Sequence, residues 1–130
     1  TLKFDLITPE KTFFSEQASQ IDIPGSEGEF GVLAGHAALI SSLKAGVVKI
    51  YSGKGDIKKL FVTGGIAEVN ATSCSVLAEK VIDLDKITKS DAEKNLATAR
   101  NKLENSFDDN AKRNAKLEVE TAEAVIGFLQ

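Results

Sequence analysis

Residues 73–103 read SCSVLAEKVIDLDKITKSDAEKNLATARNKL, and the pattern of apolar residues changes within this stretch, near residue 84. Before the change, short runs of β-forming residues are separated by turn residues. After it, apolar residues recur every three or four positions, as in a helix. Nine of the ten glycines and both prolines lie in residues 1–83, and helices exclude both residue types. The sequence therefore predicts a β domain over residues 1–84 and an α-helical domain over residues 85–130.

The first domain contains several short runs that are typical of strands. Leu2–Ile7 alternates apolar and polar residues, which predicts a half-buried strand. Gly46–Tyr51 and Asp56–Thr63 flank the turn sequence SGKG, which predicts a hairpin. Strands at such close spacing are typical of a β-sandwich or barrel, and we expect a sandwich of about eight to ten short strands. Further strands are expected at Ala18–Ile23, Ile66–Val69 and Ser73–Glu79, and a long glycine-rich loop at Pro24–Gly31.

The second domain is expected to be an antiparallel two-helix hairpin. Apolar residues follow a helical period from Ala92 onward, and a polar break at Asn105–Asn110 divides the pattern in two. Short polar side chains favour turns and caps, and a short connection makes neighbouring helices antiparallel. Asp85 is one candidate N-cap of the first helix. The capping-box pattern Ser90-x-x-Glu93 is the other.

The apolar seam between the two predicted helices consists mostly of alanine. Small residues let helices approach closely, but they bury little apolar area, so we expect an isolated hairpin to be marginally stable. Two interpretations follow. Either the hairpin packs permanently on the β domain, or its weak cohesion lets it open or dock elsewhere.

The composition excludes several classes of function. The 130-residue chain has a formal net charge of −3 and no basic face, so we expect no nucleic-acid partner. Cys74 and His36 are the single cysteine and the single histidine, too few for a Cys/His zinc site of about four ligands. The sequence has no phosphate-binding loop and no serine-elbow motif. We therefore expect no enzyme activity, no catalytic residue, no metal and no cofactor. No apolar run approaches the roughly 18–20 residues of a membrane helix, so we expect a soluble chain.

Four segments of the first domain resemble a known family. The run GSEGEFGVLAGHAAL at Gly25–Leu39 closely resembles the signature loop of the ATP synthase epsilon subunit, which is called delta in mitochondria. Over residues 2–84 the resemblance is strong and in order, whereas over residues 85–130 it rests on the alanine-rich hairpin architecture. The other three matching segments are Phe4–Glu10, Leu43–Val48 and Phe61–Val69.

The resemblance implies a non-catalytic rotor subunit in the central stalk of a proton-translocating F-type ATP synthase. In this family the sandwich holds the gamma subunit and sits on the ring of membrane c subunits. The hairpin can contact the alpha/beta head and regulate ATP hydrolysis. Association with the membrane would occur only through the complex, at the cytoplasmic face of a bacterial inner membrane. The matrix side of the mitochondrial inner membrane is the alternative location.

The resemblance also assigns candidate site residues. Glu27, Glu29 and His36 match positions that form the interface with the c-ring and gamma in the family. The competing interpretations are an ordinary solvated carboxylate for Glu29 and a structural hydrogen bond to the loop backbone for His36. Glycines expected to serve as structural turns are Gly28, Gly31, Gly35, Gly46, Gly64 and Gly65.

One departure from the family concerns nucleotide binding. Bacterial members that bind ATP carry Ile or Leu followed by Asp-x-x-Arg-Ala at the start of the hairpin. This chain has Leu84 and Asp85 in place, but Thr88 stands where the arginine would be. Threonine cannot replace the planar, forked donors of a guanidinium on a phosphate, so we expect no functional ATP binding. This disfavours the alternative of a nucleotide-sensing regulatory subunit. A third possibility is a free-standing adaptor built on the same sandwich.

Overall fold

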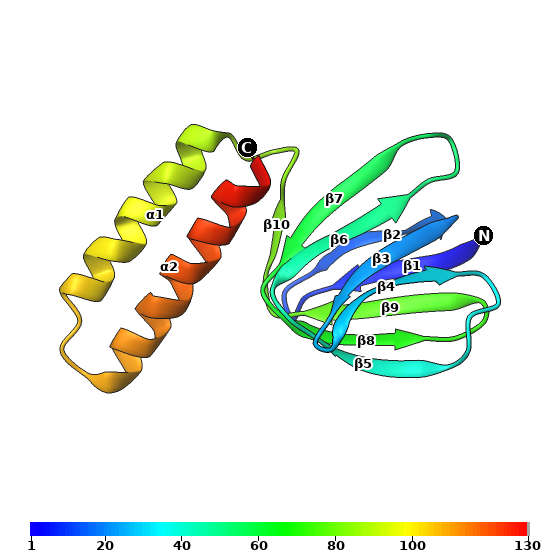
Figure 1. The fold of residues 1–130 in the computed structure, drawn as a ribbon, viewed down its shortest axis with the longest axis horizontal. Coiled ribbons are helices and arrows are strands. Elements are labelled where there is room, and N and C mark those ends of the chain that lie inside the picture. Colours follow the sequence, from blue (N-terminus) through cyan, green and yellow to red (C-terminus); the bar gives the residue numbers. More distant parts are fainter. Residues whose placement is uncertain (130) are drawn as a thin grey trace. The chain divides into compact units, whose positions relative to one another are not determined.

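The computed structural model describes residues 1–129 and shows two compact units, Thr1–Asp83 and a second that begins at Leu84. The first unit is made of ten β-strands, and the second of two antiparallel α-helices (Figure 1). The expected fold class, a β-sandwich followed by a helical hairpin, is therefore confirmed.

All ten strands of the first unit are linked by hydrogen bonds. The order is β10-β7-β6-β3-β5-β8-β9-β1-β2, and β4 pairs with β3. The β1–β9 pair is parallel, and the other pairs are antiparallel. The strands are β1 (Leu2–Ile7), β2 (Thr12–Ala18), β3 (Gln20–Gly25), β4 (Gly28–Leu33), β5 (Leu39–Leu43), β6 (Gly46–Tyr51), β7 (Ile57–Val62), β8 (Gly65–Val69), β9 (Ser73–Ala78) and β10 (Val81–Asp83).

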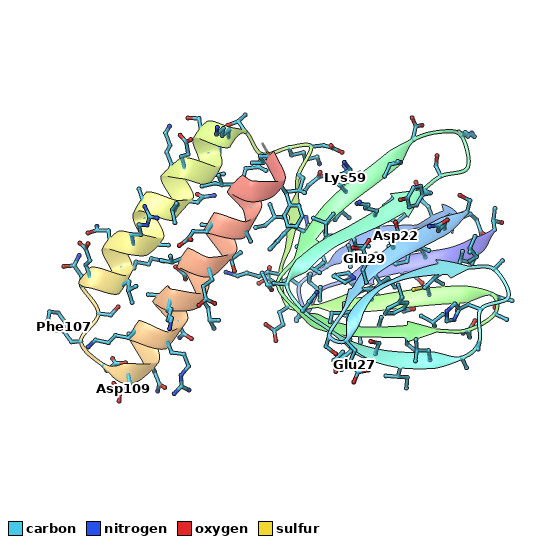
Figure 2. All side chains as sticks on the ribbon, in the orientation of Figure 1. Asp22, Glu27, Glu29, Lys59, Phe107 and Asp109 are labelled. Atoms are coloured by element: carbon cyan, nitrogen blue, oxygen red, sulfur yellow. The ribbon has the colours of Figure 1, made fainter. Side chains whose placement is uncertain are left out.

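The prediction of a long loop at Pro24–Gly31 was wrong. These residues instead form the end of β3, a tight turn and the start of β4, with Gly25 paired to Gly28 and only Ser26–Glu27 between them (Figure 2). Gly28 has a φ of 139°, which lets the chain reverse without the strain that a side chain would add. The apolar alternation of the two strands therefore outweighs their glycine content.

Two of the six glycines expected at turns lack the positive φ that a turn glycine provides. Gly31 is inside β4, where its missing side chain leaves room for Asp22, and Gly46 is the first residue of β6, close to Pro24. The other four are Gly28, Gly35, Gly64 and Gly65, and each has a positive φ.

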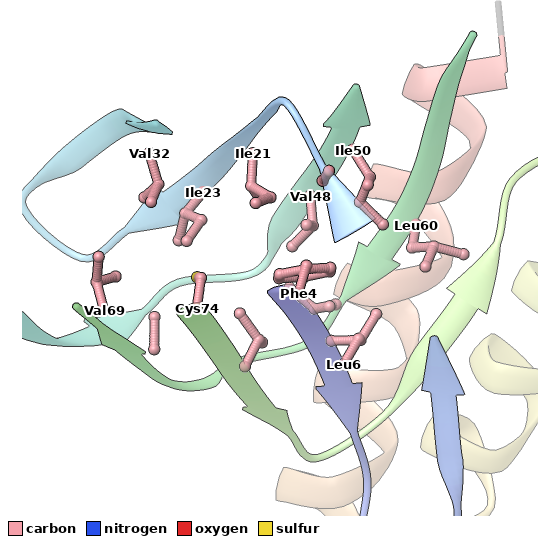
Figure 3. Close-up of a cluster of buried hydrophobic side chains, with 14 of the residues drawn as sticks. Phe4, Leu6, Ile21, Ile23, Val32, Val48, Ile50, Leu60, Val69 and Cys74 are labelled. Carbon is pink, nitrogen blue, oxygen red and sulfur yellow. The ribbon is translucent and has the colours of Figure 1, made fainter. Parts of the chain in front are cut away.

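The core of the sandwich is built from the alternate residues that face inward (Figure 3). Phe4 and Leu6 of β1, for example, are fully buried, whereas Lys3 between Leu2 and Phe4 is exposed. This is the alternation that predicts a strand buried on one face, and it fixes which side chains point outward.

The second unit consists of α1 (Lys89–Glu104) and α2 (Asp109–Leu129). Among residues 1–129, no helix combines the length and the apolar character needed to cross a membrane. The buried residues are mainly small, as the sequence predicts: Ala92 and Ala99 in α1, and Ala115, Ala122 and Val125 in α2.

The N-cap of α1 is Thr88, so both candidates from the sequence, Asp85 and Ser90, were wrong. The Thr88 hydroxyl accepts a hydrogen bond from the Asp91 N–H at 3.1 Å, and the Asp91 carboxylate accepts one from the Thr88 N–H at 3.3 Å. This is a complete capping box, with aspartate in place of the usual glutamate. The residue that replaces the family's arginine therefore has a structural role here.

Candidate functional site

The β3–β4 turn presents two carboxylates. Glu27 lies in the turn, and Glu29 is the second residue of β4, opposite Pro24. Both side chains are exposed, and both are marked in Figure 2. The tight turn thus holds two negative charges at one end of the strands.

His36 lies at the other end of the strands. It follows β4, whose six residues span about 20 Å at roughly 3.3 Å per residue. The Gly35 N–H donates to the Ala71 carbonyl at 2.8 Å, and the His36 N–H donates to the Leu33 carbonyl at 3.1 Å. The imidazole Nδ1 lies 2.7 Å from the Ala37 carbonyl oxygen. The half-buried ring is therefore tied to its own loop, which agrees with the structural interpretation of this histidine.

The structure therefore does not bring the three candidate residues together. Glu27 and Glu29 share one end of the sandwich, whereas His36 belongs to the opposite end.

Three exposed apolar side chains on the outer face of adjacent strands were missed by the sequence analysis. Ile40 of β5, Ile66 of β8 and Leu77 of β9 are 73%, 50% and 56% exposed. Ile66 lies directly opposite Leu77, and Ile40 is two residues from Ser42, which pairs with Ile66. Side chains directly opposite each other are about 4.5–5.5 Å apart, as for Ile66 and Leu77, and diagonal neighbours such as Ile40 and Ile66 are about 7–8 Å apart, so the three form one apolar patch. We call Ile40, Ile66 and Leu77 the outer apolar face.

The outer apolar face left a signal in the sequence. In β8, Ala67 and Val69 are buried, so the alternation places Ile66 and Glu68 on the solvent side. An isoleucine at one of the outward-facing positions of a strand, which are usually polar, is either an isolated exposed residue without a role or part of a contact with another protein. The neighbouring Leu77 and Ile40 favour the contact.

A polar network of three side chains in the sandwich has a structural role. The Tyr51 hydroxyl donates to one oxygen of Asp22 at 2.7 Å, and the Gln20 amide donates to the other at 2.8 Å. The hydrogen bond to Asp22 is the main cause of the raised pKa of Tyr51. Both carboxylate oxygens are thus occupied.

The single cysteine, Cys74, is not a reactive thiol. Burial of Cys74 raises the pKa of its thiol to about 12, so the thiolate that nucleophilic chemistry needs does not form near neutral pH. Residues 1–129 contain no cluster of three or more His, Cys, Asp or Glu side chains that could hold a metal ion.

The exposed apolar face of the sandwich indicates a protein that binds other proteins. Residues 1–83 match the family model of the β-sandwich domain of the ATP synthase delta/epsilon chain. The chain belongs to the ATP synthase delta/epsilon family, as a central-stalk subunit of the F-type enzyme. The resemblance noted in the sequence is therefore confirmed.

Relatives and solved structures agree with this family. The chain is 35% identical to the ATP synthase epsilon chain of Rhodospirillum centenum over 98% of this chain and 91% of that one. It is 48% identical to the epsilon chain of Rhodopseudomonas palustris over 65% and 64% of the two chains. A chain in a structure of the Euglena gracilis mitochondrial ATP synthase with OSCP, F1 and c-ring matches with a TM-score of 0.80 at 25% identity, covering 99% of this chain and 81% of that one. A Tetrahymena thermophila central-stalk chain shares the fold, with a TM-score of 0.66 at 18% identity over 99% and 96% of the two chains.

Proposed function

We propose that this peripheral subunit has no catalytic activity of its own and couples a gamma subunit to the membrane c-ring of a proton-translocating ATP synthase. The observation that carries the proposal is the outer apolar face of Ile40, Ile66 and Leu77, because a permanent partner buries such surface. The similar Euglena chain comes from an assembly that contains F1 and the c-ring, which supports these partners.

Different parts of the sandwich meet the two partners. The outer apolar face receives gamma, since apolar contact suits two subunits that stay together. Glu27 and Glu29 meet polar, basic loops of the c-ring, where paired charges fix the register and speed the encounter more than they add affinity. His36 orders its loop. The bacterial relatives favour the cytoplasmic face of a bacterial inner membrane, with the mitochondrial matrix side as the alternative.

Recovery of the tagged chain from membranes in mild detergent tests this proposal. We expect gamma, alpha, beta and c subunits to be recovered with the wild-type chain in stoichiometric amounts. Ile66→Asp should abolish the recovery of gamma. Ile57→Asp is the matched control, because Ile57 is 46% exposed on β7, outside the outer apolar face. Recovery of the wild-type chain alone would favour a free-standing adaptor.

We further propose that the hairpin regulates ATP hydrolysis by contacting the alpha/beta head. Between residues 94 and 116 there are six basic and three acidic residues, so the part around the turn carries a positive charge that suits an acidic surface. The complex with and without residues 85–130 would be compared in ATP hydrolysis, and an equal rate would contradict the proposal. A nucleotide-sensing role stays disfavoured, because the Thr88 hydroxyl serves as the helix cap.

A further inference from the structure

A row of polar residues borders the outer apolar face. The strands β5, β8, β9 and β1 lie next to one another in the sheet (Figure 1). Glu68 of β8 pairs with Ile40 of β5 on one side and with Ser75 of β9 on the other. Ser75 pairs in turn with Asp5 of β1. Directly opposed side chains lie on one face of a sheet, so both carboxylates share the face of Ile40. We call Glu68 and Asp5 the acidic row.

Apolar side chains run beside the acidic row. Leu77 is opposite Ile66 of β8 and also opposite Ile7 of β1, which is half-buried. Ile66 lies two residues from Glu68, and Ile7 lies two residues from Asp5. Two residues of a strand span about 6.6 Å, at roughly 3.3 Å per residue. A partner that covers the apolar side chains therefore comes within reach of both carboxylates.

The described part of the chain does not neutralise the acidic row. Glu68 is exposed and has no ion pair within residues 1–129. Asp5 is half-buried, and its carboxylate accepts a hydrogen bond of 2.6 Å from the neutral Ser15 hydroxyl. Lys3 lies two residues from Asp5 on the same face, and within residues 1–129 it pairs with neither carboxylate. Two strand spacings of about 4.8 Å separate Glu68 from Asp5, so two negative charges lie roughly 10 Å apart beside an apolar surface.

We propose that the gamma subunit covers the outer apolar face with an apolar surface that has basic side chains along one edge, and that these basic side chains pair with the acidic row. The inference rests on the proposed function, which supplies gamma as the partner. The apolar contact provides most of the affinity, and the charges determine the orientation of the partner. A half turn of gamma on this face would move its basic edge away from Glu68 and Asp5, so only one orientation pairs the charges.

The charge of this face argues against two other occupants. An anionic bilayer is repelled by Glu68 and Asp5, and Lys3 is the only basic residue of the four strands. A second copy of the chain would add two more carboxylates to the contact, and like charges brought together in an interface weaken binding. A basic edge on another protein meets neither objection.

Binding of the full chain to the purified gamma-containing head, from which this subunit has been removed, tests the proposal. Surface plasmon resonance gives the association rate and the Kd at about 50 mM and about 300 mM salt, where the screening of charges differs. Glu68→Gln should slow association severalfold at the lower salt, and Glu68→Lys should raise the Kd at least about tenfold. Both variants should fold normally, because the side chain is exposed. Glu27→Gln is the matched control, since it removes the same charge from the β3–β4 turn, and it should bind like the wild-type chain.

Coupling with a carbodiimide identifies the partner. The reagent joins a carboxylate to a lysine amine as an amide and itself takes up the water as a urea, so it reports contact between the two groups. We expect an amide between Glu68 or Asp5 and gamma, located by mass spectrometry. An amide to another subunit or to a second copy of this chain would overturn the proposal.

The binding data can overturn the proposal as well. Equal Kd values for Glu68→Lys and the wild-type chain would do so, and so would an equal loss in Glu27→Gln, which would show that only net charge matters. Tighter binding of the wild-type chain to vesicles of phosphatidylcholine and phosphatidylglycerol than to the head would also contradict it. Failure of the wild-type chain to bind the head would count instead against the proposed function.

Discussion

The backbone of Gly65, at the start of β8, has a φ of 144°, a conformation that residues with a side chain rarely adopt. A Cβ at this position would also collide with the carbonyl oxygen of Leu77 on β9. Gly65→Ala should therefore lower the free energy of unfolding of the sandwich by at least about 1–3 kcal/mol, the typical cost of one strained residue. Urea unfolding followed by the fluorescence of Tyr51 measures this loss. Gly127→Ala is the control, because Gly127 lies in α2 with no atom near its Cβ position, and it should be neutral or stabilising.

Cys74 makes the stability of the sandwich depend on pH in the alkaline range. Its pKa rises from 9.0 to about 12 on burial, so the native state keeps a proton that the unfolded state loses. Stability is therefore full below pH 9 and falls as the pH rises from 9 towards 12, by up to about 1.4 kcal/mol per pH unit. Urea midpoints between pH 8 and 11 measure the slope, and Cys74→Ala should reduce it. The raised pKa of Tyr51 acts in the same direction, so some slope should remain in the variant. An unchanged slope would show that the thiol is not involved.

At the scale of one element, Thr88 determines where α1 begins. Its hydroxyl and the Asp91 carboxylate satisfy backbone donors at the helix start that otherwise lack partners. Thr88→Ala should destabilise the hairpin by about 1 kcal/mol, and Thr88→Ser should restore most of the loss. The thermal midpoint of the circular dichroism at 222 nm is the measurement. Equal midpoints for the alanine and serine variants would mean that the cap contributes little.

Strands were predictable where apolar and polar residues alternate strictly and turn residues mark both ends of the strand. Leu2–Ile7 and Gly46–Tyr51 have the expected bounds. β2 was missed because its two phenylalanines, Phe13 and Phe14, are adjacent, and the β1–β2 register shifts at this point. Such a bulge adds one residue and hides the period of two. β5 and β10 were missed because the first is partly serine and the second has only three residues.

The candidate site was less predictable than the fold. The carboxylate turn of Glu27 and Glu29 was named because it matches a motif, but its distance from His36 depends on strand pairing. The outer apolar face was missed because periodicity identifies apolar residues without showing which of them stay uncovered. Ile66 lies two residues from Glu68, which was a hint in the sequence, and the burial of Ala67 and Val69 shows that this side of β8 faces outward.

At the scale of the whole molecule, two units of unequal cohesion are joined in one chain. The sandwich core contains Phe4, Leu6, Ile21 and other large side chains, whereas the buried residues of the hairpin are four alanines and Val125. Each buried CH₂ contributes about 0.8 kcal/mol, so an alanine seam stabilises much less than a leucine seam. We therefore predict that two separate domains, residues 1–84 and residues 85–130, unfold independently.

We expect the hairpin to unfold at a lower temperature than the sandwich. The chain has one tyrosine and no tryptophan, so the fluorescence of Tyr51 on β6 reports on the sandwich, while the ellipticity at 222 nm is dominated by the two helices. The 222 nm transition should come first. Ala99→Gly in α1 should destabilise the hairpin by roughly 1 kcal/mol or more, so the 222 nm transition moves to lower temperature and the tyrosine transition stays unchanged. Gly65→Ala should instead lower the temperature of the tyrosine transition and leave the 222 nm transition unchanged. Coincident transitions that shift together in both variants would mean that the chain unfolds as one cooperative unit. A hairpin that unfolds first is one that a partner surface can hold in place or release at small cost, which is what regulation through residues 85–130 requires.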